Sequence, residues 1–200
     1  MRNRSEARRE AILAAAAQEF SERGYEGASM SAIVARAGGS KQTLYNHFPS
    51  KDELFVEVML DTIGPHMDAA YVELAEDGDL CRSLCRYGQR YLTIRQSPEL
   101  IGLTRLAFGE SGRSDIGRLL FQRGKMKGVA NIAGFLAAAM GTGDLRPADP
   151  TVAAFHYYAL LDAELLDPVV LRAREPAAEA EIAAIVGRSV EAFLAAYARR

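Results

Sequence analysis

The stretch from residue 28 to residue 51 constrains the fold most, because a glycine pair separates two short segments that each begin with a helix cap. Ser29 can accept a backbone N–H as the N-cap of a first helix that runs to about Ala37. Gly38 and Gly39 stop this helix, since glycine adopts a left-handed C-cap conformation without steric cost. Ser40 caps the second helix. The first helix has apolar residues at helical spacing, namely Met30, Ile33, Val34 and Ala37.

The second helix has an apolar side and a polar side. Leu44 and Phe48 lie four residues apart and are expected to point inward. Pro49 ends the helix, and Ser50 caps the next one, which opens at Lys51. The residues that remain outside can all form hydrogen bonds, and they are Lys41, Gln42, Thr43, Tyr45 and His47.

This polar side has the geometry and the chemistry of an element that reads DNA. A short helix after a turn of three or four residues is the element that enters a major groove. Lys41 can reach a phosphate or a guanine edge, Gln42 can pair with adenine, and Thr43 can place its methyl on thymine. Tyr45 and His47 suit phosphate contacts. The alternative is a solvated helix in an ordinary helical bundle.

The helix that opens at Lys51 adds a further phosphate site, because its first N–H groups have no partner within the helix and carry partial positive charge. The complete predicted DNA-binding set includes the two capping serines and consists of Ser29, Ser40, Lys41, Gln42, Thr43, Tyr45, His47 and Lys51.

The ordered combination of these residues resembles the DNA-binding domain of TetR/AcrR-type transcriptional regulators over about residues 8–55. The resemblance is carried by Gly38, Ser40, Thr43, Leu44, Tyr45, His47, Phe48, Ser50, Lys51 and Leu54. Two residues depart from the family pattern. Gly39 stands where the family usually has an apolar residue such as Val, so a small core contact is expected to be lost. Gln42 stands where the family often has a small residue, which makes it a candidate for this chain's own base preference.

Charge is distributed unevenly along a chain of 200 residues whose net charge is −2. Residues 1–51 contain eight Lys or Arg and five Glu, a net of +3, which leaves −5 for the remainder. A basic N-terminal module on an acidic body fits DNA binding confined to one end. Arg2 and Arg4 form a basic arm that could reach along the DNA. We therefore predict a DNA-binding domain at 1–51 and an effector-binding and dimerisation domain at 52–200.

The whole chain shows helix signals, so the predicted fold is all-α with about nine helices. The first spans about Ala7 to Arg23, and the one opening at Lys51 should be broken or kinked at Gly64 and Pro65. The later helices are predicted at 79–97, 99–108, 114–140, 150–166 and 177–198. The segment 97–150 also resembles the C-terminal domain of AefR-type members of the family.

The last two predicted helices are apolar on several faces, and such helices must be buried on several faces. A second subunit can supply the cover, which gives a homodimer with a four-helix seam between equivalent surfaces. The alternative is a core within one chain. The family resemblance implies the same seam. A dimer also matches a palindromic operator, because two recognition helices then read two half-sites.

The resemblance further implies that the C-terminal domain binds a small-molecule effector and that binding moves the helix opening at Lys51. Such a site needs a mostly apolar cavity with a few polar groups. The candidates are polar or aromatic residues within otherwise apolar helices: Tyr87, Tyr91, Arg105, Asn131, His156 and Tyr158. The predicted mechanism is a population shift, in which an effector that prefers the non-binding dimer releases DNA from a repressor.

Other functional classes are less compatible with the sequence. The three histidines have no metal-ligand spacing, and no phosphate loop, nucleophile elbow or paired-carboxylate motif is present, so we expect no catalysis, metal or cofactor. Cys81 and Cys85, four apart on one predicted helix, read as small packing residues, with a redox pair as the alternative. Without a signal peptide or membrane-spanning run, a cytoplasmic protein is expected. An activator, a helical interaction module, or a regulator that answers to a protein partner remains open.

Overall fold

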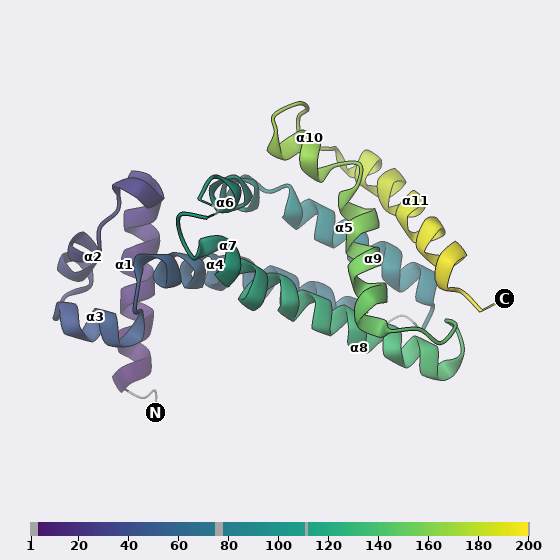
Figure 1. The fold of residues 1–200 in the computed structure, drawn as a ribbon, viewed down its shortest axis with the longest axis horizontal. Coiled ribbons are helices and arrows are strands. Elements are labelled where there is room, and N and C mark those ends of the chain that lie inside the picture. Colours follow the sequence, from purple (N-terminus) through teal and green to yellow (C-terminus); the bar gives the residue numbers. More distant parts are fainter. Residues whose placement is uncertain (1–3, 75–77, 111, 200) are drawn as a thin grey trace. The chain divides into compact units, whose positions relative to one another are not determined.

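A computed structural model describes residues 4–74, 78–110 and 112–199, and the predicted all-α fold is confirmed. Within those ranges the only strand-like pairing is an isolated bridge between Leu145 and Ala198. The helices of the first half are α1 (Arg4–Gly27), α2 (Met30–Ala37), α3 (Lys41–His47), α4 (Lys51–Leu74), α5 (Leu80–Arg95) and α6 (Pro98–Gly109). Those of the second half are α7 (Ile116–Leu120), the π-helical turn Phe121–Lys125, α8 (Met126–Thr142), α9 (Pro150–Asp162), α10 (Leu166–Val170) and α11 (Glu179–Tyr197) (Figure 1).

The chain forms two compact units, each with its own core. The first comprises Met1–Thr62 and Ala107–Phe121, and the second comprises Ile63–Leu106 and Gln122–Arg200. These units differ from the division predicted at residue 51, because the first turns of α4 bury Leu54 and Val58 in the first unit and because a later segment joins it. The functional division at residue 51 stays a prediction.

The core of the first unit is built from α1, α2, α3 and the start of α4. Phe20 of α1 meets Phe55 of α4 edge to face, with ring centroids 4.9 Å apart. Ile12, Ile33 and Leu44 are almost completely buried around them. Burial of these side chains supplies the main stabilisation of the unit, because removing apolar surface from water is the dominant favourable term in folding. This small core fixes the orientation of α3.

The predicted break of the fourth helix at Gly64 and Pro65 is wrong, because α4 continues through both residues to Leu74. Proline removes one backbone donor and normally disrupts the preceding turn. Here the turns after Pro65 bury Ala70 and Leu74 in the core of the second unit. This burial offsets the missing hydrogen bond, so the same helix contributes residues to both units.

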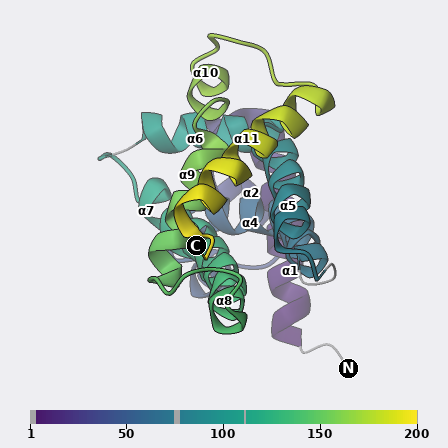
Figure 2. The same ribbon diagram turned by 90° about the vertical axis from the view of Figure 1, so that its right-hand side faces the viewer.

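The second unit is organised around α9. Helix α8 packs along α9, while α11 packs against both α5 and α9 (Figures 1 and 2). Gly88 allows α5 to come this close, since a Cβ there would lie 2.8 Å from a methyl of Val186 and 3.0 Å from one of Leu161. Much of the apolar surface of α9 is therefore covered within the chain, as the core alternative of the sequence analysis allowed.

Two predicted helix boundaries in this unit need correction. The helix predicted over 150–166 ends at Asp162, and the short helix α10 follows in a stretch for which no separate helix was predicted. Pro168 explains the change, because a continuous helix would lose the hydrogen bond of residue 168 and would clash with the carbonyl four residues earlier. A new helix starting at Leu166 places Pro168 in its first turn, where proline is tolerated.

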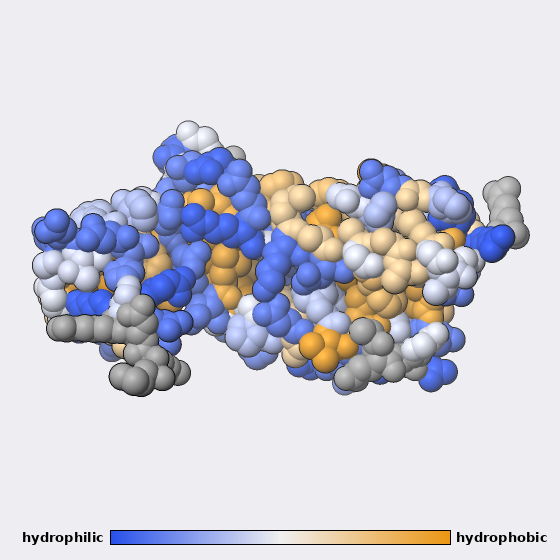
Figure 3. All heavy atoms as spheres, turned by 90° about the horizontal axis from the view of Figure 1, so that it is seen from below, coloured by the Kyte–Doolittle hydropathy of each residue, from blue (hydrophilic) through white to orange (hydrophobic). Residues whose placement is uncertain are grey.

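The outer side of α8 carries small residues without charge. Its exposed positions include Ala130, Gly134, Ala137, Ala138 and Gly141. Figure 3 views the side of the second unit along which α8 lies and shows mostly pale, weakly hydrophobic residues there. This face is smooth and apolar enough to accept another polypeptide.

Candidate nucleic-acid interface and ligand site

The two short helices of the helix-turn-helix begin as the sequence predicts. The hydroxyl of Ser29 accepts the backbone N–H of Ala32 at 3.1 Å, and that of Ser40 accepts the N–H of Thr43 at 3.1 Å. Leu44 and Phe48 are both buried, with 1% and 2% of their surface exposed. Because these two side chains anchor α3, the opposite side of the helix faces water.

The exposed side of α3 carries most of the predicted DNA-binding residues. Lys41, Gln42 and Tyr45 are exposed, and Tyr45 keeps 46% of its surface in water although it is a large aromatic residue. Thr43 is half-buried and shares a hydrogen bond of 2.9 Å with the hydroxyl of Ser40. His47 is also half-buried. The structure thus groups these residues on one short helix, while their contacts with DNA stay a prediction.

Asn46 is a further candidate that the sequence argument did not include. It is exposed on α3 next to Tyr45, and its amide can both donate and accept hydrogen bonds. The signal was present, because its position on the polar side follows from the same helical spacing as that of Gln42.

Lys51 uses its side chain inside the first unit. Its ammonium donates to the backbone oxygens of Tyr25 at 2.9 Å and of Ala28 at 3.3 Å, and lies 4.3 Å from the centre of the Tyr25 ring. These contacts hold the connection between α1 and α2 against the start of α4. A contact of Lys51 with DNA therefore concerns the backbone N–H groups at the start of α4, as the helix-terminus argument supposes.

Asp52 joins three parts of the first unit. One oxygen accepts a hydrogen bond from the hydroxyl of Tyr25, and the other accepts the backbone N–H of Asp115 at 2.8 Å. Burial, reinforced by the Asp52 carboxylate, raises the pKa of Tyr25 above its ordinary value. The carboxylate therefore binds the turn after α1 and the segment before α7 to the first turn of α4. No sequence signal links residues 63 positions apart, so this contact was missed.

Gly39 does not leave the small gap that its departure from the family pattern suggested. It has a positive φ of 92° and lies on the surface. The guanidinium of Arg8 occupies the place of a side chain there, because a Cβ on Gly39 would lie 2.0 Å from one of its nitrogens. The same guanidinium donates to the backbone oxygen of Ala37 at 3.1 Å. Arg8 therefore braces the turn between α2 and α3.

We expect Gly39→Val, the change toward the usual family residue, to destabilise the first unit. The positive φ strains any residue with a Cβ by about 1–3 kcal/mol, and the valine would displace Arg8 from Ala37. Urea unfolding measures the free energy. Gly27→Ala serves as the control, since a Cβ at Gly27 meets its nearest atom at an ordinary 3.5 Å. An unchanged unfolding midpoint for Gly39→Val would contradict this account of the turn.

Three of the six predicted ligand-site residues come together in the second unit. The hydroxyls of Tyr87 and Tyr158 lie 2.6 Å apart, and both reach the hydroxyl of Tyr71, at 3.1 and 3.0 Å. Tyr91 stacks on Tyr87 with ring centroids 6.2 Å apart. Gly128 of α8 leaves room for the hydroxyls, since a Cβ there would lie 2.8 Å from that of Tyr71. Tyr71, in the second half of α4, was not among the predicted residues.

The other three predicted residues lie elsewhere. Arg105 donates to the backbone oxygens of Val169 at 2.9 Å and of Val170 at 2.8 Å, and so holds the end of α10. Asn131 is exposed on α8, and His156 is exposed on α9, where its Nδ1 lies 2.6 Å from the hydroxyl of Tyr197. The structure gives these side chains surface or capping positions away from the tyrosine hydroxyls.

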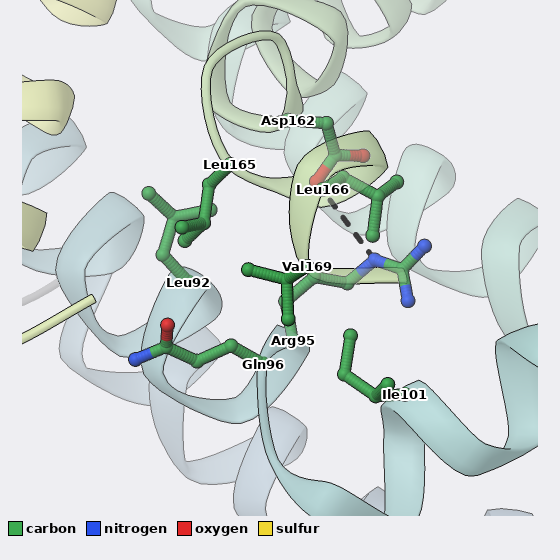
Figure 4. A pocket seen from close by; sticks show the side chains of 8 residues that line it. All are labelled: Leu92, Arg95, Gln96, Ile101, Asp162, Leu165, Leu166 and Val169. Atoms are coloured by element: carbon green, nitrogen blue, oxygen red, sulfur yellow. Dashed lines mark ion pairs between the residues drawn. The ribbon is translucent and has the colours of Figure 1, made fainter. Parts of the chain in front are cut away.

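A narrow pocket lies at the outer end of the tyrosine cluster. Its volume is about 10 Å³, close to the minimum for one water molecule. Asp162 stands at one side, where it accepts the hydroxyl of Tyr91 at 3.1 Å and pairs with Arg95 at 3.8 Å (Figure 4). The lining consists of Leu92, Arg95, Gln96, Ile101, Asp162, Leu165, Leu166 and Val169. The pocket thus combines apolar walls with one charged side.

Burial raises the pKa of Asp162 above its ordinary value, although Arg95 and Lys125 partly oppose this. A carboxyl that binds its proton more tightly in the folded than in the unfolded state makes stability fall as the pH rises above the unfolded pKa of about 3.9. We therefore expect Asp162→Asn to raise the Tm at pH 7, with a gain that shrinks toward pH 4. Thermal unfolding across this range, with exposed Glu191→Gln as control, measures it. A lower Tm at pH 7 would contradict the prediction.

The two cysteines are both free thiols. Burial raises the pKa of Cys85 to about 11, and neighbouring Cys81 adds to the shift. Because the thiolate is the reactive form, Cys85 is poorly suited to a redox role, which favours the interpretation as a packing residue.

Two structural searches over the described parts of the chain gave no site. None of the helices in 4–74, 78–110 and 112–199 combines the length and apolar character needed to cross a membrane. Over the same ranges, no group of three or more His, Cys, Asp or Glu residues is arranged to hold a metal ion.

Sequence comparisons match two family profiles. Residues 12–58 match the bacterial regulatory proteins of the tetR family, and residues 82–199 match the C-terminal domain of AefR-like transcriptional repressors. Among curated proteins, the activator FasR of Mycolicibacterium smegmatis is 50% identical over 52 residues, which are 26% of this chain and 24% of FasR. The regulator YdgC of Bacillus subtilis is 39% identical over 61 residues, 30% of this chain and 31% of YdgC. The chain thus matches less than a third of the length of these relatives.

Solved structures match over nearly the whole chain. A TetR-family transcriptional regulator from Mesorhizobium loti is 30% identical, with a TM-score of 0.82 over 99% of this chain and 100% of that one. The flavonoid-responsive regulator FrrA is 28% identical, with a TM-score of 0.76 over 97% of this chain and 98% of that one. The shared fold therefore includes both units.

Proposed function

Because this chain belongs to the TetR family of bacterial transcriptional regulators, with a C-terminal domain of the AefR-like repressor type, we propose that it is a homodimeric repressor released from a palindromic operator by a small-molecule effector. The observation that carries the proposal is the arrangement of α3. Its buried Leu44 and Phe48 fix the helix, and its exposed side presents Lys41, Gln42 and Tyr45. Such a regulator acts in the cytoplasm, where its DNA is.

The dimer forms through α9 and α11, whose outer sides combine small and apolar residues. On α9, Val152 keeps 45% of its surface exposed although it is apolar. On α11, the exposed positions are largely small: Ala180, Ala183, Ala184, Gly187, Ala192, Ala195 and Ala196. Small residues allow two helices to approach closely, and a twofold axis would bring the same surface of each copy together. Two recognition helices then read half-sites about 34–36 Å apart or a multiple of this distance.

Release follows from a population shift between dimers that fit the operator and dimers that do not. An effector that binds the second kind more tightly lowers DNA occupancy by its difference in affinity. Helix α4 supports this coupling, since it begins with Lys51 beside α3 in the chain and carries Tyr71 in its second half. The description of FrrA as flavonoid-responsive supports a small-molecule effector, whereas the description of FasR as an activator leaves the sign of regulation to experiment.

The first experiment is selection of bound sequences from a randomised duplex pool at two salt concentrations. A dimer of twice 21.8 kDa that enriches a palindrome, with weaker binding at higher salt, supports the proposal. A folded dimer that enriches no sequence would overturn it.

Two substitutions in α3 separate positioning from base recognition. We expect Tyr45→Ala to weaken binding to every duplex by a similar factor, because a phosphate contact carries no sequence information. Gln42→Ala should instead relax the preference at particular bases, by about 1–3 kcal/mol for a lost bidentate contact. Binding titrations against the selected operator and single-base variants measure both. Equal losses for both variants on every duplex would contradict the assignment.

A second candidate function is regulation through a protein partner. It is favoured by the uncharged outer side of α8, where Ala130, Gly134 and Ala137 are exposed. If this function applies, substitution of Ala137 by Glu prevents regulation and leaves operator binding by the purified dimer unchanged.

A further inference from the structure

The charged side of the narrow pocket holds more cations than carboxylates. Arg95 of α5 pairs with Asp162 of α9 at 3.8 Å, and Lys125 also acts on Asp162 electrostatically. The ammonium of Lys125 lies 4.1 Å from the centre of the Tyr158 ring, and burial lowers its pKa. Asp167 is the other acidic group in range, but it is exposed on α10, where water and salt screen it. One partly buried carboxylate therefore faces two cations.

The hydrogen-bond donors at this place also outnumber the acceptors. Tyr91 donates its hydroxyl to Asp162, and Arg95 donates a second time to the hydroxyl of Thr104 at 2.8 Å. Buried cations are costly unless they are paired, so the cluster favours an additional anion. The π-helical turn Phe121–Lys125 ends at Lys125, and single π turns inside helices often occur at functional sites.

The remaining walls of the pocket are aliphatic. Leu92 of α5, Ile101 of α6, Leu165 beside α10 and Val169 of α10 surround it, and Figure 4 shows their side chains opposite the pair of Asp162 and Arg95. A ligand that suits both sides has a negatively charged end and an aliphatic body. A cationic ligand would meet Arg95 at the charged side, and a neutral one would leave the cations as they are.

We infer that this pocket binds an amphipathic monocarboxylic acid, whose carboxylate takes a position between Arg95 and Lys125 and whose aliphatic body lies against Leu92, Ile101 and Val169. The inference rests on the proposed function, since this acid would be the effector. It also gives the adjoining tyrosines a role, because Tyr91 of the cluster donates to Asp162 at the charged side.

The pocket widens through α10. At about 10 Å³ it is too small for such an acid, so one wall must move. Helix α10 has five residues, and polar contacts from Arg105 hold its last carbonyls. The chain next to it exposes Leu171 to 76% and holds Arg172 at a positive φ of 58°. A short helix held by side chains and followed by a strained residue can shift at lower cost than the long helices around it.

The test compares three eight-carbon probes that differ in charge: octanoate, octanol and octylamine. We expect octanoate to bind the full-length protein at least tenfold more tightly than either other probe by isothermal titration calorimetry. Binding should also change amide hydrogen exchange in residues 163–174, around α10. Equal affinity for octanoate and octanol would overturn the inference, and so would binding of octanoate without any exchange change in that segment.

Two substitutions give effects of opposite sign. Lys125→Met keeps the length of the side chain and removes its charge, so octanoate should bind at least tenfold more weakly. Asp162→Asn removes the internal carboxylate that competes for the cations, so octanoate should bind more tightly. A merely structural role would weaken binding in both. Lys127→Met is the matched control, because Lys127 is exposed on α8 and pairs with Asp68 at 2.9 Å, and it should leave octanoate affinity unchanged.

Failure of this inference differs from failure of the proposed function. Specific operator binding in the absence of octanoate binding would overturn only the ligand class. Octanoate binding without operator enrichment would overturn the repressor proposal and leave the pocket assignment standing. A loss of helical circular dichroism in Lys125→Met would move the decision to Asp162→Asn, for which any weakening of octanoate affinity overturns the inference.

Discussion

Leu44→Ala should abolish specific DNA binding without changing any residue on the exposed side of α3. Leu44 keeps only 1% of its surface exposed and is one of the two side chains that anchor this helix. Truncation of a buried leucine to alanine costs about 2–5 kcal/mol, and complete domains are stable by only about 5–15 kcal/mol. A unit with so small a core would lose the fixed orientation of α3, and the recognition side chains would lose their common geometry.

The neighbouring residue supplies the control for this experiment. Tyr45→Ala changes an exposed side chain, so it should leave unfolding unchanged and lower only DNA affinity. Urea unfolding followed by circular dichroism, together with operator titration, separates the two effects. If Leu44→Ala bound the operator as tightly as the unsubstituted protein, α3 would not depend on this core for its orientation.

Phe193→Ala should destabilise the second unit by about 3–5 kcal/mol, the range for a large aromatic residue removed from a core. Phe193 is fully buried on α11. Its ring stacks on that of Tyr197 at a centroid distance of 4.8 Å and meets that of Tyr157 edge to face at 5.4 Å. Tyr157 also donates to the backbone oxygen of Leu84 on α5 at 2.6 Å. The cavity would therefore loosen the contacts that join α5, α9 and α11.

The effect can be measured through the tyrosines, because the chain contains eight tyrosines and no tryptophan. We expect urea unfolding of Phe193→Ala at a much lower midpoint, with weakened near-ultraviolet circular dichroism before unfolding. If α11 forms the dimer seam, the variant should also dissociate more readily. Ala192→Ser, at an exposed position on the same helix, should match the unsubstituted protein. An unfolding midpoint equal to that of this control would show that Phe193 is not part of an essential core.

Local features of the sequence predicted most of the helices and the side of α3 that faces water. Ser29 and Ser40 accept the backbone N–H groups that caps require, and Gly24 interrupts α1 with a positive φ where the first helix was expected to end. These features depend on residues a few positions apart, and the physical chemistry of capping and of glycine acts at that range. The same range explains why Leu44 and Phe48 could be assigned to the core.

The ligand-site prediction succeeded only in part, for a related reason. Composition indicated that polar residues within apolar helices are candidates, which selected Tyr87, Tyr91 and Tyr158 correctly as neighbours. It also selected Arg105, which holds the carbonyls at the end of α10. A polar residue in an apolar helix needs a partner, and the sequence does not show whether that partner is a ligand, a backbone oxygen or another side chain.

The sequence by itself determined the all-α class, the helix-turn-helix and the residues offered to DNA, because these follow from periodicity, caps and turn residues close together in the chain. Only the tertiary structure decided which distant groups meet. Arg8 reaches the turn beside Gly39 across 29 positions, Lys51 reaches Tyr25 across 26, and Tyr71 reaches Tyr158 across 87. Such contacts depend on how the helices pack, and many packings are compatible with one pattern of apolar residues until side-chain shape and hydrogen bonding select among them.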